Sequence, residues 1–317
     1  MITKEEFLEK YNISEDLFIS AGISWEDLCE IYSDFSVNKI PKYEKILDQF
    51  IIKYLKNINR PEQANIKIHS FKPRIKNAEH LLEKIIRKKQ ENAKKYKSIN
   101  KNNYEKFITD LIGIRCLILF KEDWINFHQY LLSNFENNTD YYIKDSLADF
   151  DEDESHNYIA EKPKVHIRNG DSHEIYEKYL SPDSILDGKI YRSVHYIIKY
   201  CGIYLEIQVR TLFEEGWGEI DHEIVYPYHQ NDPVFKEYTE LLNRLSGLAD
   251  EMSGFFQRLK ELKNNKDECS GSLNNVDNDS PSSQYHKKNN TLENSTPKNN
   301  IALSNTAKGC LRDVLDE

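Results

Sequence analysis

Residues 191–211 read YRSVHYIIKYCGIYLEIQVRT, which predicts two buried strands joined by a turn at Cys201-Gly202. Side chains alternate across a sheet with period two. The second strand therefore has an apolar face, formed by Leu205, Ile207 and Val209, and a polar face, formed by Tyr204, Glu206, Gln208 and Arg210. By the same rule, His195 and Lys199 lie opposite Val194, Tyr196 and Ile198. The polar face is either a solvated sheet surface or the floor of an active site.

Strands and helices alternate on both sides of this hairpin. The nearly continuous apolar run 111–120 predicts a central strand, and 66–71 and 164–167 are shorter strand candidates. Helices are predicted at 42–57, 77–97, 124–135 and 212–226, and a long one from Pro233 to about Leu259. The pattern predicts an α+β (α/β-like) domain with a mixed β-sheet flanked by helices.

The predicted domain organisation has three parts. Residues 1–60 form an N-terminal helical segment, and 61–263 form the main domain with its C-terminal helix. Residues 136–188 form an extended insertion within this domain. Residues 264–317 are rich in Asn, Ser, Lys and Asp, and such a low-complexity tail is expected to be disordered because it has little apolar surface to bury.

Composition excludes several classes of protein. The 53 acidic and 43 basic residues give a formal charge of −10, so no global attraction to nucleic acid is expected. No run of about 18 apolar residues occurs, which argues against a membrane protein. The five cysteines are scattered without a CxxC pair, and no secretory signal is visible, so a cytoplasmic location is expected.

A basic segment precedes the central strand. From Lys67 to Lys101 there are twelve Lys or Arg and three Glu residues. Arg74 and Lys76 stand just before the predicted helix, on which Lys84, Arg87 and Lys88 share one face. Such a face could hold several phosphate groups, or RNA, or simply be solvated.

Asp110 lies at the start of the apolar strand 111–120, and Arg115 lies within it. A charge in a buried strand requires a partner or a function. An Asp at a strand end and Glu206 on a neighbouring strand could share one Mg²⁺, which prefers carboxylate and phosphate oxygens. Basic side chains, two carboxylates and a metal suffice for phosphoryl transfer, and the chain has neither a GxxxxGK[ST] loop nor a kinase Gly-rich loop.

Three blocks of this sequence, in order, resemble the synthetase domain of the RelA/SpoT family of (p)ppGpp synthetases. They are PRIKNAEHLLEKIIRKK (73–89), ITDLIGIRCLILFKED (108–123), and YRSVHYIIKY followed by LEIQVRTLFEEGWGEIDHEIVY (191–226). The resemblance implies a nucleotidyltransferase-like fold. It also implies a pyrophosphokinase that moves the β,γ-pyrophosphate of ATP to the 3′-hydroxyl of GDP or GTP.

The resemblance also implies roles for individual residues. Asp110 and Glu206 would bind Mg²⁺, with Glu206 as the base on the acceptor hydroxyl and Arg115 assisting catalysis. ATP phosphates would be held by Arg74, Lys76, Lys84 and Arg87. The acceptor would be held by Tyr191, which stacks on its base, and by Lys189, His195, Gln208 and Arg210.

Departures from the family pattern leave the acceptor open. Gly188-Lys189-Ile190-Tyr191 replaces the usual Gly-Tyr loop, and His80 stands where the family often has Ser. Alternatives are a toxin-type member that pyrophosphorylates the tRNA 3′ end or adenine nucleotides, and a catalytically silent nucleotide- or RNA-binding regulator. A homo-oligomer or an antitoxin partner is possible. No HD dipeptide occurs, so hydrolase activity is not expected.

Overall fold

The computed structural model describes residues 2–56, 58, 65–139, 156–225 and 232–271. The sheet and all sites discussed below belong to the compact unit Met1–Asp267. The helices and helical turns are α1 (Lys4–Lys10), α2 (Glu15–Ser20), α3 (Trp25–Asp34), η1 (Phe35–Lys39), α4 (Ile40–Phe50), η2 (Ile51–Leu55), α5 (Ala78–Glu91), α6 (Ala93–Tyr96), α7 (Tyr104–Phe107), η4 (Lys121–Asp123), α8 (Trp124–Asn134), α9 (Glu174–Glu177), η7 (Pro182–Ser184), α10 (Leu212–Ile220), η8 (Asp221–Val225) and α11 (Pro233–Gly271).

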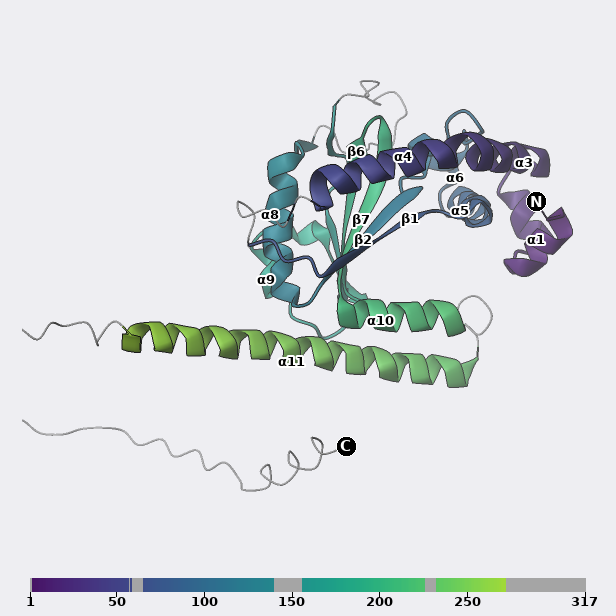
Figure 1. Ribbon diagram of the computed structural model, residues 1–317. Coiled ribbons are helices and arrows are strands. Elements are labelled where there is room, and N and C mark those ends of the chain that lie inside the picture. Colours follow the sequence, from purple (N-terminus) through teal and green to yellow (C-terminus); the bar gives the residue numbers. More distant parts are fainter. Residues whose placement is uncertain (1, 57, 59–64, 140–155, 226–231, 272–317) are drawn as a thin grey trace, which may run out of the picture. The chain divides into compact units, whose positions relative to one another are not determined.

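Among the described residues, seven strands form one mixed sheet in the order β1-β2-β7-β6-β4-β5, with β3 also paired with β6 (Figure 1). The pairs β2–β7 and β4–β5 are parallel, and the other pairs are antiparallel. This confirms the predicted fold class, a mixed sheet flanked by helices. The strands are β1 (Ser70–Ile75), β2 (Ile112–Ile118), β3 (Tyr158–Ile159), β4 (Lys164–Arg168), β5 (Ile185–Lys189), β6 (Ser193–Tyr200) and β7 (Ile203–Thr211).

The hairpin of β6 and β7 has the predicted form. Its turn residues Cys201 and Gly202 both have positive φ, 49° and 76°. Two positive values in a two-residue loop match the twist of the flanking strands, which is why such turns join tight hairpins. The turn fixes the register in which His195 stands opposite Gln208.

Helices α4 and α8 cover the apolar face of the sheet (Figure 1). Trp124 of α8 donates its indole N–H to the Tyr196 hydroxyl at 2.9 Å. The ring of Phe50, at the end of α4, meets that of Tyr200 edge-on with centroids 5.2 Å apart. Since Tyr196 and Tyr200 belong to the same face of β6, the opposite face of the sheet is left for polar side chains.

That opposite face is only partly polar, which corrects the prediction. Tyr204 and Ile197 are buried on it with Tyr158 and Ala160 as a small second cluster. Lys199 is 4% exposed, and its ammonium lies 5.6 Å from the centre of the Tyr158 ring. Strand β3 causes the burial because it pairs with this end of β6, and period two alone cannot reveal such a cover.

Two predicted elements near the basic segment differ from the structure. The strand predicted at 66–71 is found at Ser70–Ile75, so Arg74 is a strand residue. Pro73 is tolerated there because β1 is an edge strand. The helix predicted at 77–97 breaks at Asn92, whose side chain accepts a hydrogen bond from the Lys95 amide and begins α6.

Residues 136–188 contribute to the sheet instead of forming only an insertion. Strands β3 and β4 and most of β5 lie in this range, and β4 and β5 extend the sheet beyond β6. Part of the range, 140–155, lies outside the described residues. The strand predicted at 164–167 is confirmed as β4. Strand β5 was not predicted, because ILDGK offers little apolar alternation.

The two C-terminal helices follow the hairpin. The helix predicted at 212–226 is α-helical to Ile220 and then continues as the π-helical turn Asp221–Val225. Helix α11 extends to Gly271, beyond the predicted end near Leu259. Residues 272–317 of the predicted tail lie outside the described residues. Within the part of the chain that the structure describes, no helix is long and apolar enough to cross a membrane.

Candidate active site

A row of polar side chains crosses the face of the sheet opposite α4 and α8. The register aligns Gly113 of β2 with Arg74 of β1 and with Glu206 of β7. Two residues further on, Arg115 stands beside Gln208, which in turn faces His195 of β6. Side chains in register share a face, so the row is formed by Lys72, Arg74, Arg115, Glu206, Gln208, Arg210 and His195.

Glu206 lies at the centre of this row. Its carboxylate accepts a hydrogen bond from the Gln208 amide at 2.7 Å and lies 3.2 Å from Nδ1 of His195. Burial raises the pKa of Glu206, but the hydrogen bond and charge of His195 outweigh burial and leave the pKa below its ordinary value. Glu206 is therefore ionised at neutral pH and can accept a proton or bind a cation.

Asp110 forms a second anionic centre, just before β2. One of its oxygens, Oδ2, lies 3.0 Å from the Lys76 ammonium and 2.6 Å from that of Lys84. Burial raises the pKa of Asp110, but the charges and hydrogen bonds of Lys76 and Lys84 outweigh burial and lower the pKa to about 2. The other oxygen, Oδ1, is buried without a hydrogen-bond partner among the described residues.

A basic hollow of about 470 Å³ opens beside Asp110. That volume is typical of a site for a small molecule such as a nucleotide. Burial lowers the pKa of Lys76, one of its cations. Arg87 lies at the rim, where it contacts Glu83 and Glu91 of its own helix. The lining includes Arg74, Lys76, His80, Lys84, Arg87, Asp110, Asp221 and His222.

Arg115 is held at one end of the row by helix α10. It contacts Glu215 at 2.8 Å and also Glu219, which accepts from Lys72 at 2.7 Å. Hydrogen bonds from Lys72 and Arg115 lower the pKa of Glu219 to about 2. The structure thus places Arg115 on the floor of the row but pairs it with α10, away from Asp110.

Aromatic and imidazole rings gather at the other end of the row. The Tyr191 ring stacks on His166 with centroids 5.2 Å apart and planes at 13°, and the Arg210 guanidinium lies 5.5 Å from its centre. His166 is also 4.6 Å from His195. Burial lowers the pKa of His166 to about 4, so its ring is neutral at pH 7. His166 was not predicted as a site residue, although period two and its place in the strand candidate 164–167 could have indicated it.

Lys189 is placed differently from the other predicted acceptor residues. It lines a separate hollow of about 550 Å³ together with Arg168, Trp217 and Arg244. Its charge still contributes to the lowered pKa of His166. Lys189 therefore borders the ring cluster without joining the row around Glu206.

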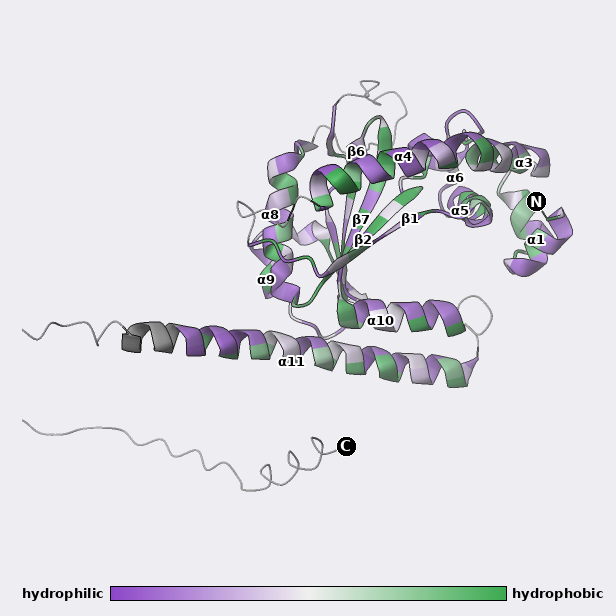
Figure 2. Ribbon diagram, viewed as in Figure 1, coloured by the Kyte–Doolittle hydropathy of each residue, from purple (hydrophilic) through white to green (hydrophobic). Residues whose placement is uncertain are grey.

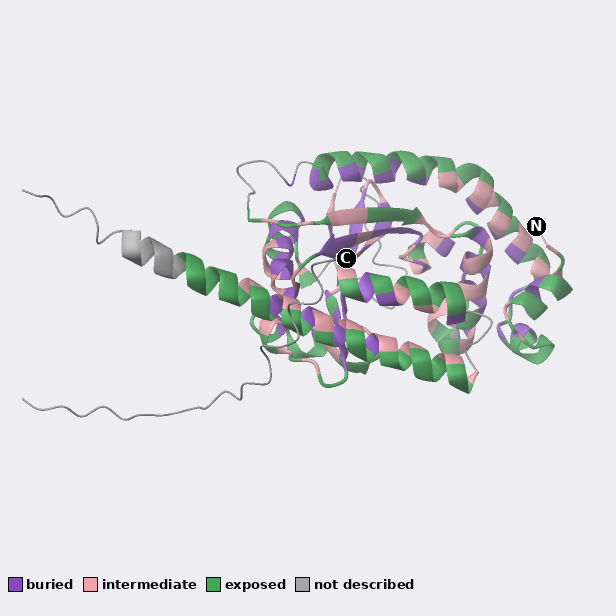
Figure 3. Ribbon diagram, turned by 60° about the horizontal axis from the view of Figure 1, so that its bottom comes forward, coloured by how far each residue is buried: buried purple, intermediate pink, exposed green. Residues whose placement is uncertain are grey.

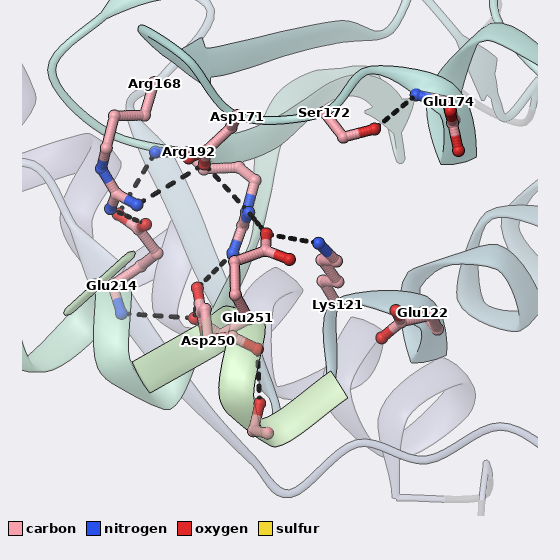
Figure 4. Close-up of polar contacts among 12 residues, drawn as sticks. Lys121, Glu122, Arg168, Asp171, Ser172, Glu174, Arg192, Glu214, Asp250 and Glu251 are labelled. Atoms are coloured by element: carbon pink, nitrogen blue, oxygen red, sulfur yellow. Dashed lines mark hydrogen bonds and ion pairs between the residues drawn. The ribbon is translucent and has the colours of Figure 1, made fainter. Parts of the chain in front are cut away.

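A buried ion network beneath the site was missed from the sequence (Figure 4). Arg192, next to Tyr191, pairs with Asp250 of α11 and with Asp171. Arg168 pairs with Glu214 of α10 and donates to Asn243 of α11 at 2.7 Å. The residues on both sides of Arg192 belong to the polar face, so period two directs Arg192 to the apolar face. A charge on that face requires a buried partner, and this pattern could have indicated the network from the sequence. The network fixes α10 and α11 against the sheet.

The residues present fit a magnesium ion. The free Oδ1 of Asp110 and the ionised Glu206 are carboxylate oxygens, the donors that Mg²⁺ prefers. No group of three or more His, Cys, Asp or Glu that could hold a metal occurs within the described residues. Two carboxylates suffice where substrate phosphates and water complete the shell.

One ionised carboxylate that lines a basic hollow, and a second on the polar face of the same mixed sheet, are typical of enzymes that transfer phosphoryl groups. Comparison with protein families gives a more specific answer. Residues 73–231 match the model of the region found in RelA / SpoT proteins, which is half of the chain. The chain therefore belongs to the RelA/SpoT family, as its motifs predicted, and is a pyrophosphotransferase of the (p)ppGpp synthetase type.

Solved structures similar to this chain include several bacterial proteins. The small alarmone synthetase 1 from Bacillus subtilis is 21% identical, with 72% of this chain and 99% of that one covered and a TM-score of 0.47. Smu.1046c from Streptococcus mutans is 21% identical, with 70% and 95% covered and a TM-score of 0.46. A GTP pyrophosphokinase family protein from Streptococcus pneumoniae is 20% identical, with 82% and 97% covered and a TM-score of 0.39. The search of curated proteins found no match.

Proposed function

We propose that the protein transfers the β,γ-pyrophosphate of ATP to the 3′-hydroxyl of GDP or GTP. The observation that carries the proposal is the position of the two carboxylates. Asp110 borders a hollow lined by lysine and arginine, and Glu206 borders the rings of His195, His166 and Tyr191. The phosphates of ATP, in the basic hollow, and the guanine base of the acceptor, at the rings, would thus meet across the centre of the polar row.

The donor half holds polyphosphate. Lys76 and Lys84 both contact Asp110, and Arg74 lines the same hollow. When ATP binds, its phosphate oxygens offer these lysines further acceptors, and Arg74 provides a planar fork. Arg87 at the rim reaches the outer phosphates by leaving Glu83 or Glu91. Four cations then stabilise the charge that develops on the transferred group.

Asp110 and Glu206 would hold Mg²⁺. When bound, the ion would neutralise phosphate charge in the transition state. Asp110 is suited to this role because one oxygen is fixed by two lysines while the other is free of partners among the described residues. Fixed lysines orient the free oxygen, as hydrogen-bonded partners commonly orient metal ligands.

Glu206 also accepts the proton of the acceptor hydroxyl. Its lowered pKa keeps it ionised before the reaction. Gln208 and His195 hold both carboxylate oxygens, so the group is oriented before substrate binds. Arg210 donates to Gln208 at 2.9 Å and thereby supports the same arrangement.

Tyr191 binds the acceptor base by stacking. His166 occupies a stacking position on its ring, and His195 lies beside both. Lys189 borders the cluster and is available for an acceptor phosphate. A planar purine suits these rings, whereas several cations of the basic segment that would suit tRNA are already engaged: Lys89 donates to the Tyr96 and Lys97 carbonyls, and Lys88 pairs with Glu91.

Transfer of label tests the proposal directly. Purified protein is incubated with γ-labelled ATP and Mg²⁺, and with GDP, GTP, AMP or deacylated tRNA as acceptor. We expect label on GDP or GTP and none on AMP or tRNA. Label on tRNA or AMP alone would overturn the choice of acceptor, and ATP binding without any transfer would overturn the enzymatic proposal.

A further inference from the structure

A second hollow lies between the last two helices and the end of β5, apart from the basic hollow beside Asp110. Its volume is about 550 Å³, which is within the range of sites for small molecules. Helices α10 and α11 run side by side here (Figure 1). The hollow, called here the α10–α11 hollow, is bounded by Lys189, Ile190, Trp217 of α10, Val225 of η8, and Lys236 and Arg244 of α11.

The floor of this hollow is formed by buried side chains whose polar groups already have partners. Arg168 donates through Nε to the side-chain oxygen of Asn243 at 2.7 Å and pairs with a carboxylate of α10. The Asn243 amide donates to the Ile190 carbonyl, and the Trp217 indole N–H donates to a carbonyl of α11 at 3.0 Å. Val225, also buried, is apolar. The floor therefore offers a ligand mainly apolar contact.

The rim of the hollow is cationic. Lys189 lies at the end of β5, and Lys236 and Arg244 lie about two turns apart on one face of α11. All three are exposed, and none of them has an ion pair among the described residues. Glu240 lies between the two cations of α11, so one carboxylate stands against three cations at this rim. A chain with a formal charge of −10 thus has a local excess of positive charge here.

We propose that the α10–α11 hollow binds an organic anion with an apolar body and a single carboxylate group. The apolar body is buried against Trp217 and Val225, where it gains free energy by leaving water. The carboxylate lies at the rim, where Lys236 and Arg244 donate to it. Figure 2 shows hydrophobic and hydrophilic residues on both α10 and α11, and Figure 3 shows buried and exposed residues alternating where α11 passes α10. A ligand of mixed character matches walls of mixed character.

A nucleotide fits this hollow less well than it fits the basic hollow. A purine base has several N–H groups and ring nitrogens, and each one that is buried without a partner costs free energy. Arg168, Asn243 and Trp217 are already engaged and offer little to such a base. Asp221 lines both hollows, but one carboxylate cannot serve every polar group of a base. The basic hollow, by contrast, has Asp110 with an oxygen that lacks a partner among the described residues.

The α10–α11 hollow adjoins the candidate active site but can be tested apart from it. Ile190, whose carbonyl accepts from Asn243, directly precedes Tyr191. Lys236 and Arg244 belong neither to the lining of the basic hollow nor to the ring cluster around Tyr191. Substitutions at these two positions therefore report on the α10–α11 hollow, whatever the outcome of the transfer assay.

Calorimetric titration of the full-length chain with octanoate tests the site. We expect one octanoate per chain, and we expect octan-1-ol, which has the same apolar body without the charge, to bind about tenfold more weakly. Lys236→Glu combined with Arg244→Glu should weaken octanoate binding by at least this factor. Lys260→Glu combined with Lys263→Glu makes the same change of charge at exposed positions of α11 outside the hollow and should bind like the parent chain.

Three results of these titrations would overturn the proposal. They are a parent chain that does not bind octanoate, octanoate binding that is unchanged by the substitutions at Lys236 and Arg244, and octan-1-ol binding as tight as that of octanoate. A titration with GTP separates the other class of ligand. A GTP site that the parent chain has and the Lys236 and Arg244 double variant lacks would identify the ligand as a nucleotide, and the proposal would be wrong.

Thr239→Phe tests the position of the apolar body. Thr239 lines the hollow, so a phenyl ring at this position occupies the space of the ligand and should abolish octanoate binding. Thr239→Ser leaves the space open and should bind like the parent chain. Circular dichroism should give the same helix content and melting temperature for both variants. Octanoate binding that survives Thr239→Phe would place the ligand elsewhere and overturn the proposal.

Discussion

Two clusters of opposite charges in this protein look alike in a list of residues and differ in their access to solvent. In one, Asp110 contacts Lys76 and Lys84 at the wall of a hollow of about 470 Å³. In the other, Arg192 and Asp250 pair with each other, and their side chains are only 4% and 1% exposed (Figure 4). The first cluster can exchange its partners for a ligand, whereas the second can only stabilise the fold.

The difference lies in the space that each cluster borders. The lysines of the open cluster border space that phosphate oxygens can enter, and ammonium groups re-pair easily. The Arg192 guanidinium also contacts Asp171, and Thr211 donates to the Asp250 carboxylate at 2.9 Å. Removing one member of this buried set leaves a buried charge without its partner. Substitutions in the buried cluster should therefore act mainly on stability, and substitutions in the open cluster should also act on activity.

Arg192→Met should have the largest effect on stability. It leaves Asp250 buried without its main partner and should lower the free energy of unfolding by about 3–5 kcal/mol. Urea denaturation measures the loss. Combining it with Asp250→Leu should recover part of that loss, since no uncompensated charge then remains. A loss below about 1 kcal/mol for the single variant would contradict the structural role of the closed cluster.

Glu206→Gln should have the largest effect on activity. The substitution preserves shape but removes the proton acceptor, and transfer should slow by about 10²–10³-fold, which corresponds to about 3–4 kcal/mol. Initial rates with ATP and GDP measure it, and the melting temperature should stay close to that of the parent chain. Glu5→Gln, on exposed α1, serves as the matched control. An unchanged rate would remove the proposed role of Glu206.

Asp110→Asn should affect both rate and stability. The lowered pKa of Asp110, about 2 against an ordinary 3.8, stabilises the fold at pH values above 3.8, and this contribution is lost as pH falls through 2. The substitution should therefore cost about 2 kcal/mol at pH 7. It should also raise the Mg²⁺ concentration needed for half-maximal rate. Asp48→Asn, at an exposed position of α4, should change neither, and an unaltered Mg²⁺ requirement would exclude Asp110 as a ligand.

Tyr191→Ala should have the smallest effect and act on one substrate alone. Loss of the stacking ring should raise the KM for GDP about tenfold, or about 1.4 kcal/mol, with little change in the KM for ATP. Tyr191→Phe keeps the ring and should behave like the parent chain. Equal changes in both KM values would show that the ring acts on the fold of the site and not on the acceptor.

The sequence predicted the hairpin, the fold class and the family because these depend on short-range patterns. Period two separated Glu206, Gln208 and Arg210 from the buried residues between them, and the structure confirms that separation. The basic residues and Asp110 were identified from their spacing. The structure adds that Lys76 and Lys84 both reach Asp110.

What was missed depends on contacts between distant segments. Strand β5 was missed, and the predicted strand at 164–167 was not placed in the sheet; His166 of β4 reaches Tyr191 only after β4 pairs with β6. The burial of Lys199 depends on β3, which pairs with it from about forty residues away in the chain. Local patterns carry no information about which strand covers which.

The sequence by itself determined the alternation of polar and apolar residues, and with it the hairpin, its polar face and the long helix that begins at Pro233. Alternation is local, because it follows from the geometry of a strand or a helix. Only the tertiary structure decided which faces are open. It buried the pair of Arg192 and Asp250 and left Asp110 beside a hollow, because burial depends on what the rest of the chain brings against each face.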